Sequence, residues 1–316
     1  MENINSTITN DDAYSYFSIF INCLCSIGLI ANALLLYIFT SDKFFRKTTY
    51  YLMLICVISD GISNISSLSS SNLLLITKLY QSEGMDVICR LFGSVVYISY
   101  GISIMNLCLI SIDRYFAFVK PLNYFYRTYK SKIIIITEVF IWIISAAVAI
   151  PDFVFIQAQR GNRFICDYPN ITTSISVYLV FFSAFFYVLP SIVIIIIYWR
   201  IIIFQRNYIR PGQQSRQLQQ DLENKKKLIK SLISISLCYV LTTFPYFALM
   251  FAMGLTRVNL TQIQNRSPAL FILSLLAVSM TGNITIINPF LLLRFDGNIR
   301  RRFREILVRV REMRRK

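Results

Sequence analysis

The sequence lacks histidine altogether and has few charged residues. Of its 316 residues only 15% are Asp, Glu, Lys or Arg, well below the roughly 25% usual in soluble proteins. Without histidine, the chain has no imidazole for acid–base catalysis or metal binding. Its seven cysteines include no C-x-x-C pair, so neither a zinc site nor a disulfide scaffold is indicated. No cluster of titratable residues suggests catalysis either, and we expect no enzymatic activity.

Apolar residues, in contrast, are abundant. They make up 55% of the chain, and the mean hydropathy is +0.56. A helix that crosses the hydrocarbon core of a membrane needs about 20 of them. Seven runs are long enough, which predicts an all-α membrane protein with seven transmembrane helices: Tyr14–Phe39, Tyr50–Ile76, Val87–Val119, Ile133–Phe155, Ile175–Phe204, Leu228–Leu255 and Ala269–Leu293. The chain then divides into an N-terminal segment (1–13), a seven-helix bundle (14–293) and a C-terminal segment (294–316).

Basic residues are distributed unevenly between the two sides of this predicted bundle. One side carries 26 of the 32 Lys and Arg residues, and basic loops mark the cytoplasmic side of a membrane protein. We therefore expect a multi-pass protein of the plasma membrane with its N-terminus outside and its C-terminus in the cytoplasm. The formal net charge of +16 is then a topology signal, and nucleic acid is not expected as a partner.

Sequons for N-glycosylation agree with this orientation. Four of them fall in segments assigned to the outside, where carbohydrate is attached. The predicted glycosylation sites are Asn5, Asn170, Asn259 and Asn265.

Ionisable residues within the predicted spans are functional candidates, because burial in lipid is costly. Asp60 lies too deep in the second span to reach water and needs polar partners. Glu138 lies near the inner end of the fourth span, and we expect its side chain to extend to the cytoplasmic face. Candidate partners for Asp60 are Asn32, Ser103, Thr285 and Asn288.

Short motifs follow one another in an order typical of one receptor family. The strongest is Ser111-Ile-Asp113-Arg114-Tyr115, which continues to Pro121-Leu122 and resembles the D-R-Y-x-A-x-x-x-P-L signature of rhodopsin-like (class A) G-protein-coupled receptors. Over its whole length the chain resembles this family, and we interpret it as a receptor of the invertebrate neuropeptide type. The other matching positions are Gly28, Asn32, Ser59, Asp60, Cys89, Trp142, Pro190, Tyr198, Pro245, Asn288 and Pro289.

The resemblance implies a mechanism in which an extracellular ligand shifts the bundle toward a state whose sixth helix has moved outward. That movement would open a cleft for a heterotrimeric G protein. The residues implied in coupling are Asp113, Arg114, Tyr115, Pro121, Leu122 and Tyr198. Those implied in the repacking core of activation are Ile104, Pro190, Tyr239, Pro245, Asn288 and Pro289.

The resemblance also implies a disulfide and an ion site. Cys89 and Cys166 are the only cysteines on the oxidising outer side, so we expect them to be joined. Asp60, Ser103 and Asn288 resemble the family's sodium site, and no other cofactor is expected.

Three positions depart from the family pattern. Thr243 stands in place of the sixth-helix tryptophan, and Leu292 in place of the tyrosine of N-P-x-x-Y. Lys225 stands where many members have an acid that pairs with the D-R-Y arginine. Arg114 would then be held mainly by Asp113, which predicts measurable signalling without a ligand.

The ligand is constrained mainly by exclusion. Amine receptors have an Asp where this chain has Val96, and opsins have a lysine where it has Gly282. A neuropeptide is the leading interpretation; the alternatives are a lipid, a small chemosensory molecule, or a signalling-impaired decoy or heteromer partner. A transporter is disfavoured, since no internal repeat is visible. The expected pocket residues are Tyr97, Tyr100, Tyr246, Phe247 and Met250.

The C-terminal segment predicts a membrane contact. After Arg294, apolar residues recur every three or four positions amid ten basic residues counted from Arg294 onward, the pattern of an amphipathic eighth helix on anionic membrane lipids. No Ser or Thr follows Thr285, so we expect weak arrestin recruitment.

Overall fold

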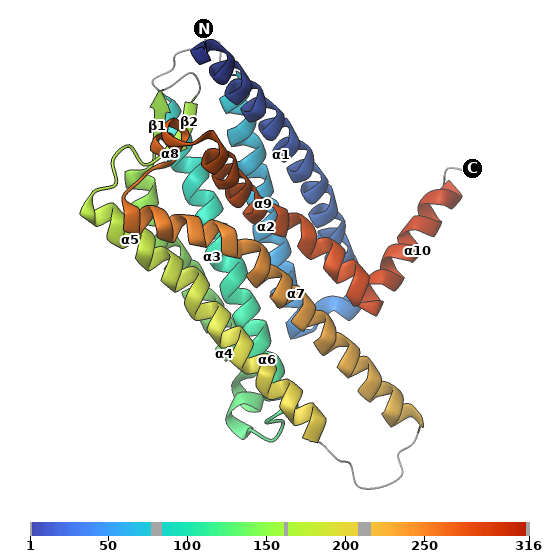
Figure 1. Ribbon diagram of the computed structural model, residues 1–316. Helices are drawn as coiled ribbons and strands as arrows, with labels where there is room; N and C mark the ends of the chain where they lie inside the picture. The colour runs from blue at the N-terminus through green and yellow to red at the C-terminus, as the bar shows by residue number, and fades with distance from the viewer. Residues whose placement is uncertain (1, 77–83, 161–163, 208–215, 314–316) are drawn as a thin grey trace.

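The computed structural model describes residues 2–76, 84–160, 164–207 and 216–313, which form a bundle of long helices (Figure 1). In chain order its elements are α1 (Glu2–Ser41), a 3-10 turn (Lys43–Arg46), α2 (Thr48–Ile76), α3 (Met85–Phe118), α4 (Tyr124–Phe155), β1 (Gln157–Arg160), β2 (Phe164–Asp167), α5 (Thr173–Ser183), a π-helical turn (Ala184–Val188), α6 (Leu189–Asn207), α7 (Arg216–Thr256), α8 (Leu260–Arg266), α9 (Pro268–Phe295) and α10 (Gly297–Met313).

Seven of these helical segments are suited to span a membrane. Six are each long and apolar enough, with α5, the π-helical turn and α6 counted as one, and α9 supplies the seventh although its halves are inclined by 48°. Large apolar side chains cover the outside of the bundle; Ile30, Ile143 and Leu273 are each 60% or more exposed. Such a surface suits lipid, where each helix must satisfy its own backbone. The predicted seven-helix membrane fold is confirmed.

Three helices begin well before the apolar runs that predicted them. α1 begins at Glu2 rather than Tyr14, α4 at Tyr124 rather than Ile133, and α7 at Arg216 rather than Leu228. An apolar run marks only the part of a helix in hydrocarbon, whereas a capping residue decides where the helix starts. For α4 the cap is Asn123, whose side chain accepts a hydrogen bond of 2.9 Å from the backbone N–H of residue 126.

The sequence analysis also missed a short β-hairpin. β1 and β2 pair antiparallel, with Ala158 opposite Cys166. Strands of four residues are too short for an alternating pattern to be recognised with confidence in an apolar chain.

α3 lies at the centre of the bundle. Within its most apolar stretch 67% of residues are buried, against 28–50% in the other five spans measured as single helices. Gly101 permits this close packing: a Cβ atom there would lie 2.7 Å from Ser145 Oγ and 2.8 Å from the ring of Phe186. α3 therefore touches neighbours that a larger residue would push away.

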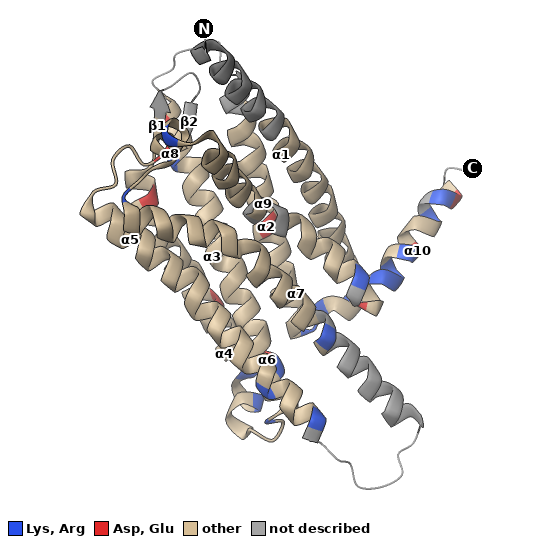
Figure 2. Cartoon of the chain, viewed as in Figure 1, with Lys and Arg blue, Asp and Glu red and all other residues tan. Residues whose placement is uncertain are grey.

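The two ends of the bundle differ in charge. Lys and Arg gather where α4 begins, where α6 ends and along α10 (Figure 2), and we call this the basic end. The opposite end carries the hairpin, α8 and the Cys89–Cys166 bond, and we call it the disulfide end. α10 projects sideways from the basic end (Figure 1).

Candidate functional site

A buried acid lies at the middle of the bundle. Asp60 of α2 is 2% exposed. Ser103 Oγ of α3 donates a hydrogen bond to its Oδ1, and Asn288 Nδ2 of α9 donates to its Oδ2, each at 3.0 Å. No Lys or Arg among the described side chains contacts this carboxylate. The structure thus brings together the three residues for which the family resemblance implied an ion site.

Pro289 creates a second polar network beside this acid. Because proline has no N–H, the carbonyl of Thr285, four residues earlier, has no helical donor. Asn32 of α1 supplies one, its Nδ2 lying 2.7 Å from that oxygen. Thr285 Oγ1 in turn donates to Asn64 Oδ1 at 2.8 Å. Asn32 and Thr285, expected as partners of the buried acid, therefore lie mainly in this neighbouring network.

At the basic end one carboxylate serves two cations. Asp113 is 1% exposed; its Oδ2 lies 3.5 Å from Arg114 Nη2, and its Oδ1 forms an ion pair with Lys130. Tyr126 Oη donates to the same Oδ1 at 2.8 Å. Arg114 therefore shares the negative charge of Asp113 with Lys130, which weakens the attraction between Asp113 and Arg114. Lys225 lies outside the residues whose side chains the structure describes.

The other residues implied in coupling lie around this pair. Tyr198 of α6 is buried and receives a hydrogen bond of 3.4 Å from Ser236 Oγ of α7. Tyr115 is partly buried against the core. Pro121 and Leu122 lie in the turn before α4, where Leu122 is 90% exposed. An apolar side chain this exposed is available to a protein partner.

The residues implied in activation meet in the core. Ile104 of α3 and Tyr239 of α7 are each 2% exposed, and Pro190 of α6 is buried. Pro245 is half-buried within α7. Thr243, which replaces the family tryptophan, donates its hydroxyl to the carbonyl of Tyr239 at 2.8 Å. Its polar group is therefore satisfied within its own helix.

A junction that the sequence analysis missed joins α2, α9 and α10. Tyr50 Oη donates to Asp296 Oδ2 at 3.1 Å. Asp296 Oδ1 accepts from the backbone N–H groups of Asn298 (2.8 Å) and Ile299 (3.2 Å), so it caps α10. Leu292, in place of the family tyrosine, is buried one turn earlier. Nothing in the local sequence links Tyr50 to a residue 246 positions away.

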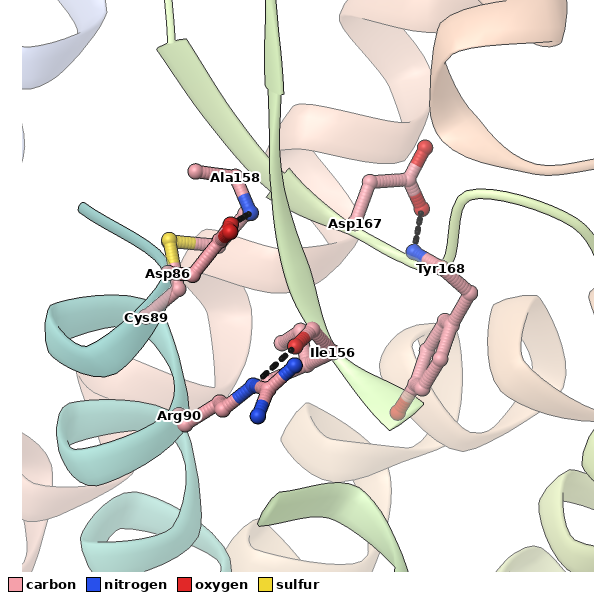
Figure 3. The surroundings of a disulfide bond; sticks show 8 residues. Asp86, Cys89, Arg90, Ile156, Ala158, Asp167 and Tyr168 are labelled. Atoms are coloured by element: carbon pink, nitrogen blue, oxygen red, sulfur yellow. Dashed lines mark hydrogen bonds between the residues drawn. A yellow bond between two sulfur atoms is a disulfide. The ribbon is translucent and has the colours of Figure 1, made fainter. Parts of the chain in front are cut away.

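The predicted disulfide joins Cys89 of α3 to Cys166 of β2, with Cα atoms 5.5 Å apart. Two hydrogen bonds reinforce it (Figure 3): Asp86 Oδ1 accepts from the backbone N–H of Ala158 at 2.8 Å, and Arg90 Nε donates to the carbonyl of Ile156 at 3.3 Å. The segment from α4 to β2 is therefore fixed to α3 at three points, and the disulfide prediction is confirmed.

The same segment is also fixed to α8. Asp167 Oδ2 accepts from the backbone N–H (2.9 Å) and the hydroxyl (3.0 Å) of Thr261. Burial raises the pKa of Asp167, although the hydrogen bonds from Thr261 oppose this shift. Asn259 Nδ2 donates to the carbonyls of Tyr168 (2.9 Å) and Pro169 (3.0 Å). The loop after the hairpin is thus tied down on two sides.

These contacts correct one predicted glycosylation site. Asn259 is 3% exposed, both of its amide hydrogens are donated to carbonyls, and its Oδ1 accepts from the N–H of Gln262 at 2.8 Å. A glycan does not fit there, and we withdraw that prediction. Asn170 and Asn265 are exposed and remain predictions. The side chain of Asn5 lies outside the described residues.

A cavity of about 290 Å³ lies at the disulfide end. Four of the five expected pocket residues line it: Tyr97, Tyr100, Tyr246 and Met250. Phe247 does not; its ring stacks on Tyr187 (5.2 Å between centroids) and Phe182 (5.8 Å) in the contact between α5, the π-helical turn and α7. The expectation for Phe247 is wrong because it is one residue from Tyr246 and faces another side of the helix.

The cavity has further walls that the sequence analysis did not find. Tyr168 and Asp167 belong to it, brought there by the disulfide-linked loop. Ser67, Ser70 and Ser71 line its α2 side, and Ser71 Oγ donates to Asn22 Oδ1 of α1. Only the tertiary fold brings Asp167 and Tyr168 to the same cavity as Tyr97, which lies about 70 residues earlier in the chain.

Glu138 does not reach the aqueous face. It is 7% exposed and lies beside Asn106 of α3 and Trp142. The expectation that its side chain extends to the cytoplasmic face is wrong, because the carboxylate is buried against these neighbours within the bundle.

Comparison with known proteins identifies the family. The profile of the family described as "7 transmembrane receptor (rhodopsin family)" matches residues 31–292. The chain belongs to this family, whose members are receptors and not enzymes.

The chain is similar to several individual receptors. It is 30% identical to G-protein coupled receptor 183 of Homo sapiens over 70% of this chain and 60% of that protein. It is 28% identical to muscarinic acetylcholine receptor M2 of Gallus gallus over 63% and 42%, and 24% identical to dopamine receptor 4 of Caenorhabditis elegans over 57% and 34%. The chain therefore spans about a third to three-fifths of the length of these relatives.

Proposed function

We propose that the receptor binds an extracellular small molecule at the disulfide end and activates a heterotrimeric G protein at the basic end. The observation that carries the proposal is the position of both sites on α3. Tyr100 lines the cavity and Arg114 lies 14 residues further along the same helix, a distance of about 21 Å. Repacking around α3 can couple the two sites.

The basic end is the cytoplasmic end in this proposal. The excess of Lys and Arg there supports it, and α10 would lie on anionic membrane lipid. Its apolar Ile299 is buried, whereas Arg300, Arg301 and Arg304 are exposed. The disulfide and exposed Asn170 and Asn265 suit the opposite, extracellular side.

The size of the cavity favours a small ligand over a neuropeptide. A volume of about 290 Å³ lies at the lower limit of small-molecule sites, roughly 300–1,000 Å³. A peptide could insert only a side chain or two. Two of the relatives are also named for small molecules, dopamine and acetylcholine. A lipid, a small chemosensory molecule and a neuropeptide remain the alternative ligands to test.

Signalling is favoured over a decoy role by the coupling residues. The contact of Asp113 with Arg114 and the burial of Tyr198 in the core support this choice. In the activation step we propose, α7, the sixth span, moves outward and exposes Arg114 to the G protein. Weak arrestin recruitment stays a prediction from the scarcity of phosphorylation sites.

The residues around Asp60 partly fit a sodium ion. The carboxylate and the Ser103 hydroxyl are oxygen ligands of the kind Na⁺ prefers. Asn288, however, turns Nδ2 and not its oxygen toward the acid. We therefore assign Asn288 the role of a hydrogen-bond donor that orients the Asp60 carboxylate, and not that of a ligand to the ion. A bound sodium ion would neutralise the charge of Asp60.

The proposal is tested by ligand-free signalling. Cells that express the full chain with dissociation sensors for each G-protein class are compared with Arg114→Ala and with Arg127→Ala, an exposed arginine of α4 at the same end, all at equal surface expression. We expect a basal signal that falls at least fivefold in Arg114→Ala and persists in Arg127→Ala. No signal with any class, or an equal signal from Arg114→Ala, contradicts the proposal.

A further inference from the structure

We infer that the cavity recognises a small molecule with an ammonium group, and that Asp152 of α4 provides the counter-charge. This inference rests on the proposed function, since it names the chemistry of the ligand that the receptor binds.

Asp152 is a buried acid with spare capacity. It is 0% exposed, and Tyr168 Oη donates to its Oδ1 at 2.6 Å. Its Oδ2 has no hydrogen-bond partner. No described Lys or Arg side chain pairs with it, and Arg90, the cation of α3 nearest the disulfide in sequence, binds the carbonyl of Ile156 (Figure 3). A buried carboxylate without a cation is costly, and a cationic ligand would offset that cost.

The carboxylate lies directly behind the cavity wall. A Cβ atom on Gly93 would be 3.2 Å from Asp152 Oδ2, so the acid occupies the space that the glycine leaves open. Gly93 and Tyr168 both line the cavity. Asp152 therefore lies behind two residues of the cavity wall. Gly93 has no side chain to separate the acid from the cavity, and the Tyr168 hydroxyl is hydrogen-bonded to the acid.

Tyrosine rings supply the rest of a cation site. Tyr97 and Tyr100 of α3 each lie 6.3 Å from Tyr246 of α7 between ring centroids, and all three line the cavity together with Tyr168. Aromatic faces attract ammonium groups. Burial, with the charge of Asp152, raises the pKa of Tyr168 well above its usual value. Its hydroxyl stays protonated and keeps the carboxylate oriented.

The remaining lining disfavours anions. It includes no Lys or Arg among the described residues, and its one acid, Asp167, is bonded to Thr261. Val96, where amine receptors have their Asp, lies one turn along α3 from Gly93. In this chain a buried acid lies instead on the neighbouring helix α4, so the valine at position 96 does not exclude an amine.

Charge-matched probes test the inference on the purified full-length receptor without a G protein. A panel of primary and quaternary amines is used, each with an alcohol and a carboxylate of the same skeleton; 2-phenylethylamine, 2-phenylethanol and 3-phenylpropanoate form one such trio. Equilibrium binding and the ligand-induced rise in Tm are measured. We expect at least one amine to bind tenfold or more tightly than its alcohol and its carboxylate.

Variants then separate charge from shape. Asp152→Asn keeps an acceptor for Tyr168, and we expect it to weaken amine binding at least about 30-fold while alcohol binding changes less than twofold. Glu312→Gln removes an exposed acid of α10, which takes no part in the cavity, and should leave amine binding within threefold. Tyr168→Phe removes the hydroxyl that orients the carboxylate but keeps the ring. We expect it to weaken amine binding severalfold, and it tests the inference if Asp152→Asn fails to fold.

Three results overturn the inference: no amine of the panel binds, the alcohol or carboxylate binds most tightly, or Asp152→Asn and Tyr168→Phe bind the amine as the wild type does. The proposed function fails separately. An amine that binds through Asp152 but dissociates no G protein leaves this inference intact and removes the signalling proposal. A ligand that signals through Arg114 with a potency unaffected by Asp152→Asn supports the proposed function and overturns this inference.

Discussion

At the scale of single residues, the division of the Asp113 charge between two cations sets how firmly Arg114 is held. Lys130 binds Oδ1 together with Tyr126, whereas Arg114 approaches Oδ2 at 3.5 Å, longer than a strong charge-assisted hydrogen bond. The arginine side chain is 12% exposed, and its Nε has no hydrogen-bond partner. In the coupling step that we propose, release of Arg114 to a G protein would break only a weak contact, which agrees with the signalling without ligand that we expect.

Replacement of Lys130 tests this division. In Lys130→Met, Arg114 becomes the one described cation that pairs with this carboxylate, although Tyr126 still donates to Oδ1. We expect ligand-free G-protein dissociation to fall two- to fivefold, a change of about 0.4–1 kcal/mol, as for a partly screened ion pair. Lys132→Met, an exposed lysine on the same helix, should leave the signal unchanged. A basal signal that stays the same or rises in Lys130→Met would show that this lysine does not compete with Arg114.

At the scale of helices, close approach to α3 depends on the absence of a side chain at Gly101. A methyl group there would press on Ser145 of α4 and on Phe186 of the π-helical turn. The rings around Phe186 are packed edge to face, with centroids 5.2 Å from Phe182. Such a packed wall cannot give way without moving a helix. Gly61 of α2, by contrast, has no atom within 4 Å of the corresponding position.

The two glycines give opposite predictions. Gly101→Ala should destabilise the receptor by roughly 1–3 kcal/mol through overpacking, seen as a lower Tm of the purified protein in detergent. Gly61→Ala should leave the Tm unchanged or raise it, because alanine stabilises a helix by up to about 1 kcal/mol over glycine. Equal Tm values for both variants would contradict the close packing of α3 described above.

The sequence predicts helices far better than their ends and contacts. Seven spans were found because crossing a membrane demands a long apolar run, and this demand is local. The starts of α1, α4 and α7 were missed because a polar continuation has no such signal. The error at Glu138 arose because its burial depends on neighbouring side chains such as Asn106 of α3. The hairpin β1–β2 was missed because its stability comes from the disulfide and from α3.

The candidate site divides in the same way. Asp60, Asp113 and Arg114 were found because charges are rare in apolar spans. Asp152 meets the same criterion, because it lies within the predicted span Ile133–Phe155, but the sequence analysis overlooked it. Tyr168 and Tyr126 were missed because their importance depends on partners from other elements, which only the tertiary contacts reveal.

At the scale of the whole molecule, α3 connects two sites that differ in rigidity. At the disulfide end a covalent bond, a hydrogen bond donated by Arg90 and hydrogen bonds accepted by Asp86 and Asp167 fix the loop over the cavity. At the basic end the described contacts between α6 and α7 include only one side-chain hydrogen bond near Arg114, at 3.4 Å. The bundle can therefore open at the basic end while its other end stays closed.

Distance measurement tests this claim most directly. Spin labels carried on unnatural amino acids at Arg127 of α4 and Lys230 of α7, both exposed, avoid the native cysteines. Their separation is measured in purified receptor alone and with nucleotide-free G protein. We predict a second, longer distance that appears with the G protein and is absent in Arg114→Ala. A single distance that the G protein leaves unchanged would contradict the account.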